Sequence, residues 1–151
     1  MAYDGDFKPF FQYIADSIYT YASQRDRQKG EAFVHGYTLA LTSQCRFYRP
    51  ISEFDNQGGY ADIFLRPLHE IFSDMEHSYI IELKYLPMTA TEAEAERQWK
   101  EAESQIRGYA EGPVVHRMTQ GTTLHLVIAQ LKGYDLLKLA QVDEFLAKPI
   151  R

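Results

Sequence analysis

The hydrophobic residues of this chain first follow a helical period. Aromatic and aliphatic side chains recur every three or four positions in the first part of the chain, and this spacing is typical of amphipathic helices. It predicts one helix over residues 6–23, beginning near Asp4 or Asp6, and a second over residues 31–43, with a polar, charged link between them. The side chains expected to face inward from the second helix are Phe33, Val34, Tyr37, Ala40 and Leu41.

Short apolar segments bounded by breaker residues come next. β-Branched and aromatic residues dominate residues 45–51, 60–66 and 78–85, so these segments are predicted strands, with a Gly-rich loop over residues 52–59 between the first two strands. The polar loop between the last two contains His69 and His77. These histidines lack the spacing of a zinc site, and we expect both to be exposed.

A long amphipathic helix is expected after the third strand. Thr89 and Thr91 open it, Thr89 forms a capping-box pattern with Glu92, and Gly112 followed by proline ends it. The stripe expected to be buried contains Ala95, Trp99, Ala102, Ile106 and Tyr109. Gln105 lies at the margin of that stripe, where its amide needs a hydrogen-bond partner, either in a site or on the backbone.

The last part of the chain completes a mixed α/β pattern. Residues 122–130 alternate well enough for a further strand, and residues 134–142 predict either a last strand or a short helix. The order of elements favours a mixed, mostly antiparallel sheet of about four or five strands, flanked by helices. A chain of 151 residues buries enough surface for one core. We therefore predict one domain over residues 1–151, with residues 1–29 as an N-terminal helical extension.

Two of the predicted strands carry charged residues inside runs that are otherwise apolar. Asp62 lies in one strand, and Glu82 and Lys84 lie in the next. Alternate residues of a strand share a face, so Glu82 and Lys84 point the same way and Leu83 points the other way. Burying such charges is costly unless they are compensated. Two carboxylates beside a lysine therefore predict a site for a hard cation, with an ordinary ion pair at a sheet edge as the alternative.

These residues resemble the signature of the PD-(D/E)XK nuclease superfamily. The matching motifs, in order, are Glu31-Ala32-Phe33, Gly59-Tyr60-Ala61-Asp62-Ile63, Ile80-Ile81-Glu82-Leu83-Lys84, and Gln105-Ile106 with Tyr109. They are most similar to the nuclease-like domain at the C-terminal end of bacterial AAA-ATPase-like proteins. The chain departs from that branch at Tyr60, where the branch often has arginine.

The resemblance implies a restriction-endonuclease-like fold and a metal-dependent phosphodiesterase, that is, a nuclease. Asp62, Glu82 and the backbone carbonyl of Leu83 would then hold Mg²⁺ or Mn²⁺. Lys84 would orient the attacking water and stabilise charge on the phosphate, and Gln105 would point toward the metal-binding strands. Glu31 would bind a second ion or a metal-bound water. Its alternative role is that of a carboxylate stabilising a helix N-terminus.

Charge and cysteine content restrict the partners of the chain. The net charge of −5 is unfavourable for binding phosphates, although site carboxylates neutralised by a metal would account for part of it. The single cysteine, Cys45, excludes an internal disulfide and fits a reducing compartment. No apolar stretch approaches the length of a membrane span. We therefore expect a cytoplasmic protein that does not enter a membrane.

The expected partner is nucleic acid, with DNA as the expected substrate, and an ATPase is a candidate protein partner. Two alternatives remain beside the active nuclease. One is a catalytically inactive binding module that keeps the nuclease fold, and the other is an interaction domain whose motif is coincidental. The complete set of Glu31, Asp62, Glu82, Lys84 and Gln105 argues against both, because buried charges without a function leave their desolvation uncompensated.

Overall fold

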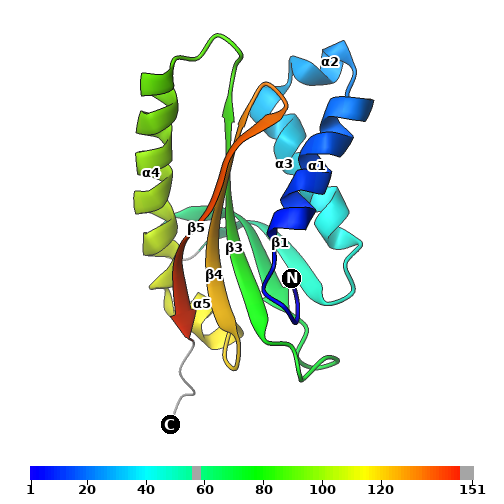
Figure 1. Cartoon of the computed structure of the whole chain (residues 1–151). Coiled ribbons are helices and arrows are strands. Elements are labelled where there is room, and N and C mark those ends of the chain that lie inside the picture. Colours follow the sequence, from blue (N-terminus) through cyan, green and yellow to red (C-terminus); the bar gives the residue numbers. More distant parts are fainter. Residues whose placement is uncertain (56–58, 147–151) are drawn as a thin grey trace.

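Five strands form one sheet, in the order in which they occur in the chain (Figure 1). The computed structural model describes residues 1–55 and 59–146. The strands are β1 (Tyr48–Asp55), β2 (Tyr60–Pro67), β3 (His77–Leu86), β4 (Thr123–Lys132) and β5 (Asp135–Leu146). Neighbouring strands are antiparallel except β3 and β4, which are parallel. The predicted mixed, mostly antiparallel sheet is confirmed, and its last element is a strand.

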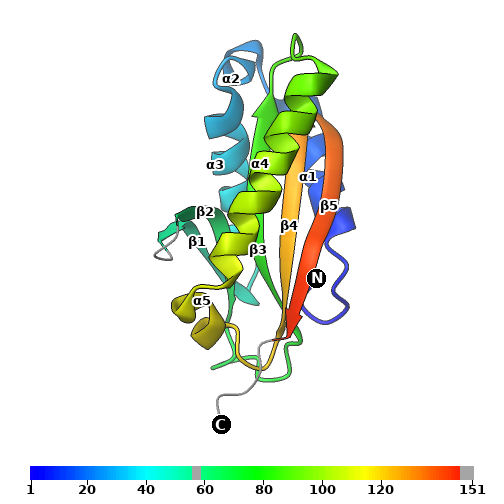
Figure 2. The same cartoon turned by 90° about the vertical axis from the view of Figure 1, so that its left-hand side faces the viewer.

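Helices cover both faces of this sheet (Figures 1 and 2). The helices α1 (Lys8–Tyr21) and α3 (Gly30–Ser43), joined through the short α2 (Gln24–Arg27), lie on one side. The helices α4 (Glu92–Ala110) and α5 (Pro113–Met118) lie on the other side. They form the connection from β3 to β4, since two parallel strands cannot be joined by a tight turn.

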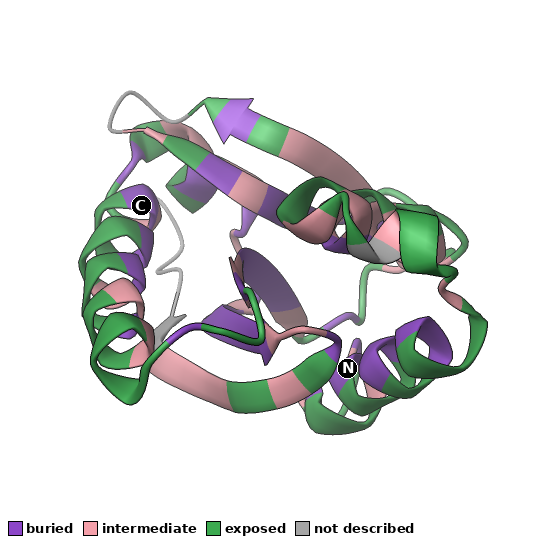
Figure 3. Cartoon of the chain, turned by 90° about the horizontal axis from the view of Figure 1, so that it is seen from above, coloured by how far each residue is buried: buried purple, intermediate pink, exposed green. Residues whose placement is uncertain are grey.

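Two apolar clusters fill the space between the sheet and its helices. Phe11 and Ile18 of α1 belong to the same cluster as Ile81 of β3, and Ile106 of α4 belongs to the same cluster as Ile80. Because β3 is buried on both faces, its sequence is an almost unbroken apolar run. Seen from above, the inner sides of the helices are buried and their outer sides are exposed (Figure 3).

The predicted boundaries of the first strand are wrong. This strand begins at Tyr48 rather than Cys45, and it continues through Asp55. Phe54 pairs with Ala61 at the start of β2, so residues 52–55 of the expected loop extend the ladder instead. Residues 56–58 of that expected loop lie outside the residues that the structure describes. Pairing with β2 decides where this strand ends, and the propensities of its own residues do not predict that pairing.

The helices differ from the prediction in three places. The hydroxyl of Thr91, not that of Thr89, accepts from the N–H of Glu94 and closes the capping box of α4. The charged link after α1 contains the helix α2, which has a capping box of its own. The pattern did not predict α5, which begins at a proline whose fixed φ suits the first turn of a helix.

The buried stripe of α3 is rotated from its predicted position. Val34 is buried as expected, but Thr38 and Thr42 are buried with it, whereas Ala40 is exposed. The hydroxyl of Thr38 donates to the main-chain oxygen of Val34, and that of Thr42 donates to the main-chain oxygen of Leu39. Threonine can therefore be buried here, because a carbonyl one turn earlier satisfies its hydroxyl.

The histidines expected in an exposed loop are half-buried. His77 is the first residue of β3, and its Nδ1 lies 2.8 Å from Nε2 of His125 on β4. His69 lies in the turn before β3, with its Nε2 3.1 Å from the carbonyl oxygen of Met75. Both side chains are therefore parts of local hydrogen-bond networks.

Candidate functional site

The charged residues lie where β2 and β3 stop pairing. The ladder between these strands ends at the pair Ile63 and Ile81. Asp62 comes next on β2, and its Oδ2 accepts from the main-chain N–H of Leu83 at 2.8 Å. A side-chain carboxylate thus satisfies a buried backbone donor that has no partner in the strand ladder between β2 and β3. This hydrogen bond holds the Asp62 side chain against β3.

Glu82 and Lys84 form an ion pair beside this point. Oε1 of Glu82 lies 2.7 Å from Nζ of Lys84, as expected for residues on one face of a strand. The same ammonium donates to Oε1 of Gln105, on α4, at 3.3 Å. Glu82 is 2% exposed, and among the described residues its Oε2 has no hydrogen-bond partner. A buried carboxylate oxygen is therefore left with unused acceptor capacity.

The electrostatics of the site disfavour negative charge. Burial, followed by the charge of Asp62, raises the pKa of Glu82 to about 7, although Lys84 opposes this effect. Burial also raises the pKa of Asp62, against the hydrogen bond from Leu83 and the charge of Lys84. Burial lowers the pKa of Lys84, but the hydrogen bond and charge of Glu82, with Asp62 and Glu31, outweigh it and raise the pKa overall. Two carboxylates thus share a site with less positive charge than would neutralise both.

An open cavity of about 370 Å³, here called the acidic hollow, lies next to Asp62. Its lining residues are Glu31, Ala32, His35, Glu53, Asp62 and Leu83. Glu31 lies in the first turn of α3 and is exposed, and its charge raises the pKa of Lys84. The structure therefore joins Glu82, Lys84 and Gln105 through direct contacts. It holds Asp62 beside them through the N–H of Leu83, and it places Glu31 in the wall of the hollow.

Sequence reasoning missed three residues of this region. Nε2 of His35 lies 3.0 Å from the main-chain oxygen of Asp62 and 3.3 Å from Oγ of Ser52. Glu53, on the hollow wall, has a φ of 48°, in the left-handed region that residues other than glycine seldom adopt. His35 follows Glu31 by one helical turn, and that spacing was the available signal. Ser52 and Glu53 were expected in a loop, so no signal pointed to them.

Tyr109 of α4 also borders the charged residues. Burial, and then the charges of Glu82 and Asp62, raise the pKa of its hydroxyl to about 12. Gly59 lies against the ring, since a Cβ at this position would be 2.9 Å from Cε1 of Tyr109. Tyr109 is part of the motif recognised in the sequence, and it belongs to the apolar cluster between α4 and the sheet.

The residues present fit a hard divalent cation. Asp62 and Glu82 offer carboxylate oxygens, and the unpartnered, buried Oε2 of Glu82 is a position that a cation would stabilise. No three His, Cys, Asp or Glu side chains of the described residues form a ready ligand group. A small ion such as Mg²⁺ commonly takes one or two carboxylates and completes its shell with water, carbonyl and phosphate oxygens.

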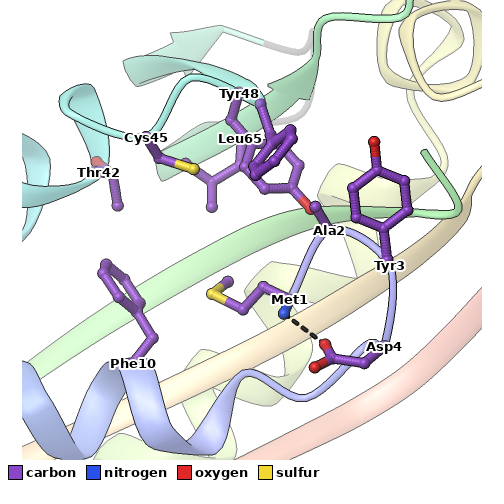
Figure 4. Close-up of a pocket in the computed structure, with 10 residues that line it drawn as sticks. Met1, Ala2, Tyr3, Asp4, Phe10, Thr42, Cys45, Tyr48 and Leu65 are labelled. Carbon is purple, nitrogen blue, oxygen red and sulfur yellow. Dashed lines mark hydrogen bonds and ion pairs between the residues drawn. The ribbon is translucent and has the colours of Figure 1, made fainter. Parts of the chain in front are cut away.

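A second cavity, of about 310 Å³, has a different chemical character (Figure 4). It lies between the N-terminal segment, α1 and the strands, with Phe10, Cys45 and Leu65 among its lining residues. Its one carboxylate, Asp4, is paired with the Met1 amine at 2.5 Å. Because its lining is mostly apolar and this charge is compensated, the cavity does not offer a metal site.

Comparison with known families agrees with the geometry. A family model of the PD-(D/E)XK nuclease superfamily matches residues 29–139, a span that includes Glu31, Asp62, Glu82, Lys84 and Gln105. No curated protein and no solved structure matches the chain. The five-stranded mixed sheet with flanking helices is consistent with a restriction-endonuclease-like fold. Among the described residues, no helix has the length and apolar character needed to cross a membrane.

Proposed function

The chain belongs to the PD-(D/E)XK nuclease superfamily, and we propose that it is a metal-dependent nuclease that hydrolyses phosphodiester bonds, with DNA as its substrate. The observation that carries this proposal is a pair of carboxylates, the half-buried Asp62 and the buried Glu82, beside the ammonium of Lys84. Two carboxylates that share one ammonium in an otherwise apolar region are destabilising. A site that binds a cation and a phosphate group accounts for their presence.

Asp62, Glu82 and the backbone carbonyl of Leu83 would hold Mg²⁺ or Mn²⁺, and Glu31 would supply a further carboxylate from the hollow wall. Carboxylate and carbonyl oxygens are the donors that these ions prefer. When bound, such a cation polarises a phosphate ester and increases the acidity of water. The raised pKa of Glu82 supports this assignment, because the side chain lacks enough positive charge around it.

Lys84 supplies the positive charge that the reaction needs at the phosphate. Its ammonium is held by Glu82 and Gln105, so it is oriented before substrate arrives. Negative charge accumulates on the phosphate oxygens as the water attacks, and a fixed cation stabilises that charge more than it stabilises the ground state. In this scheme Gln105 positions Lys84 and does not itself contact the reacting atoms.

We also propose that residues 1–151 form one cytoplasmic domain that works with a partner such as an ATPase. The N-terminal helix α1 shares an apolar cluster with β3, which supports one domain. A net charge of −5 supports a partner, because affinity for a phosphate backbone comes mostly from lysine and arginine. A partner that binds nucleic acid would supply the affinity that this chain lacks.

The proposal is tested by cleavage assays on supercoiled, linear and single-stranded DNA and on RNA, with Mg²⁺, Mn²⁺ or EDTA. The parent is expected to cut with metal and not with EDTA, and Asp62→Asn is expected to lose both cleavage and metal affinity. Asp135→Asn is the matched control, because Asp135 is exposed at the start of β5. If the parent neither binds metal in calorimetry nor cuts any substrate, the chain is an inactive binding module.

A further inference from the structure

The main-chain carbonyl of Asp62 interacts with a helix side chain. The β1–β2 ladder pairs Ser52 with Ile63 and then Phe54 with Ala61, so it omits the pair Glu53 and Asp62. Glu53 has a left-handed φ of 48° at this point. The ladder is thus interrupted beside Asp62, and a carbonyl there requires another partner.

His35 supplies that partner from α3. Its Nε2 lies 3.0 Å from the Asp62 carbonyl oxygen, which can only accept, so Nε2 carries the proton. Oγ of Ser52, at 3.3 Å from the same nitrogen, makes a longer contact. One imidazole N–H therefore connects α3, β1 and the residue on β2 that carries the site carboxylate.

The two ends of Asp62 are fixed by different elements. The carbonyl is bonded by His35, and the carboxylate is bonded by the N–H of Leu83. When both side chains are ionised, Asp62 and Glu82 repel each other, and such groups separate unless the structure holds them. A tether on the main chain therefore keeps this carboxylate beside Glu82 while no cation is bound.

We propose that His35 is a positioning residue, which fixes the main chain of Asp62 through its Nε2–H and thereby holds the carboxylate in its metal-binding place. This inference rests on the proposed function for its purpose, but the tether itself can be measured without metal or substrate. Replacing a residue that supports a metal ligand through a hydrogen bond typically lowers metal affinity about 10-fold to 100-fold.

The test compares side chains that differ in one donor. His35→Gln places an amide N–H near the position of Nε2, whereas His35→Leu has no donor. His35→Asn is polar but too short to reach the carbonyl, so it separates the lost bond from a general packing defect. His69→Leu is the matched control, because it removes another contact between a histidine Nε2 and a carbonyl, at 3.1 Å, outside the site.

The first measurement is the amide exchange of Leu83 by NMR in the metal-free protein. Exchange at Leu83 should rise in His35→Leu and His35→Asn, stay near the parent in His35→Gln, and remain unchanged in His69→Leu. The second is Mn²⁺ titration by calorimetry, where affinity should fall about 10-fold or more in the first two variants and recover in His35→Gln.

Unchanged Leu83 exchange and Mn²⁺ affinity in His35→Asn and His35→Leu would overturn the proposal. A His35→Gln variant as defective as His35→Leu would also overturn it, since the ring and not its donor would then matter. If the tether is found but the parent does not cleave nucleic acid, the proposed nuclease function fails and the positioning role stands.

Discussion

Replacing Glu82 by glutamine is expected to stabilise the metal-free protein at alkaline pH. Glutamine has nearly the shape of a protonated glutamate, but it cannot ionise. In the parent, burial and then the charge of Asp62 raise the pKa of Glu82 from its ordinary 4.5 to about 7. The folded parent therefore keeps this proton over a pH range in which the unfolded chain has lost it. The folded state loses stability as pH rises through this range.

The magnitude follows from the two pKa values. A difference between 4.5 and about 7, at about 1.36 kcal/mol per pH unit, corresponds to about 3 kcal/mol. Below pH 4.5 the carboxyl group is protonated in both states and contributes no difference. Above pH 7 the full penalty applies to the parent and is absent from the variant. The free energies of unfolding of parent and variant should thus converge in acid and diverge in base.

Urea denaturation in EDTA, from about pH 4.5 to pH 8.5, measures this difference. Glu82→Gln should be about 3 kcal/mol more stable than the parent at the alkaline end and equal to it at the acidic end. Glu101→Gln, an exposed position on α4, is the control and should change stability by less than about 0.5 kcal/mol at every pH. Addition of Mn²⁺ should favour the parent, because only the parent keeps both carboxylate ligands.

A parent that is more stable than Glu82→Gln at alkaline pH would refute this reasoning. The ion pair with Lys84, at 2.7 Å, would then outweigh burial and the repulsion from Asp62. A difference that does not vary with pH would show that Glu82 ionises alike in both states, and that packing alone separates the two proteins.

Three further predictions concern neighbouring residues. Lys84→Met should reduce cleavage about 10²–10³-fold in a steady-state assay, while Mn²⁺ affinity measured by calorimetry persists or increases because a competing positive charge is removed. Gln105→Ala should lower kcat less than Lys84→Met does, with a thermal midpoint near that of the parent, because Gln105 is exposed and its bond to Lys84 is 3.3 Å long. Gly59→Ala should lower the free energy of unfolding, measured in urea, by about 1–3 kcal/mol. The reason is that Gly59 has a φ of 132° and a Cβ there would lie 2.9 Å from the ring of Tyr109. An unchanged midpoint would mean that the ring moves away without cost.

Local patterning determined most of the elements of this protein. The helical period over α1, α3 and α4, and the apolar runs of β2 and β3, specify helices and strands because each element must bury one face or both. Glu82 and Lys84 are two residues apart in one strand, so their shared face and their ion pair also follow from the sequence. The sequence also indicated the site residues, because an apolar strand normally excludes charged side chains.

The tertiary structure decided which groups meet and where the ladders stop. The end of the β2–β3 pairing at Ile63 and Ile81 exposes the N–H of Leu83 to Asp62, and no local pattern encodes that end. The contact of His35 with the Asp62 carbonyl joins residues that are 27 positions apart through an interrupted ladder. The period of the hydrophobic residues indicates which face of an element is buried. Hydrogen bonds between elements depend instead on the register and twist of the strands in the folded sheet.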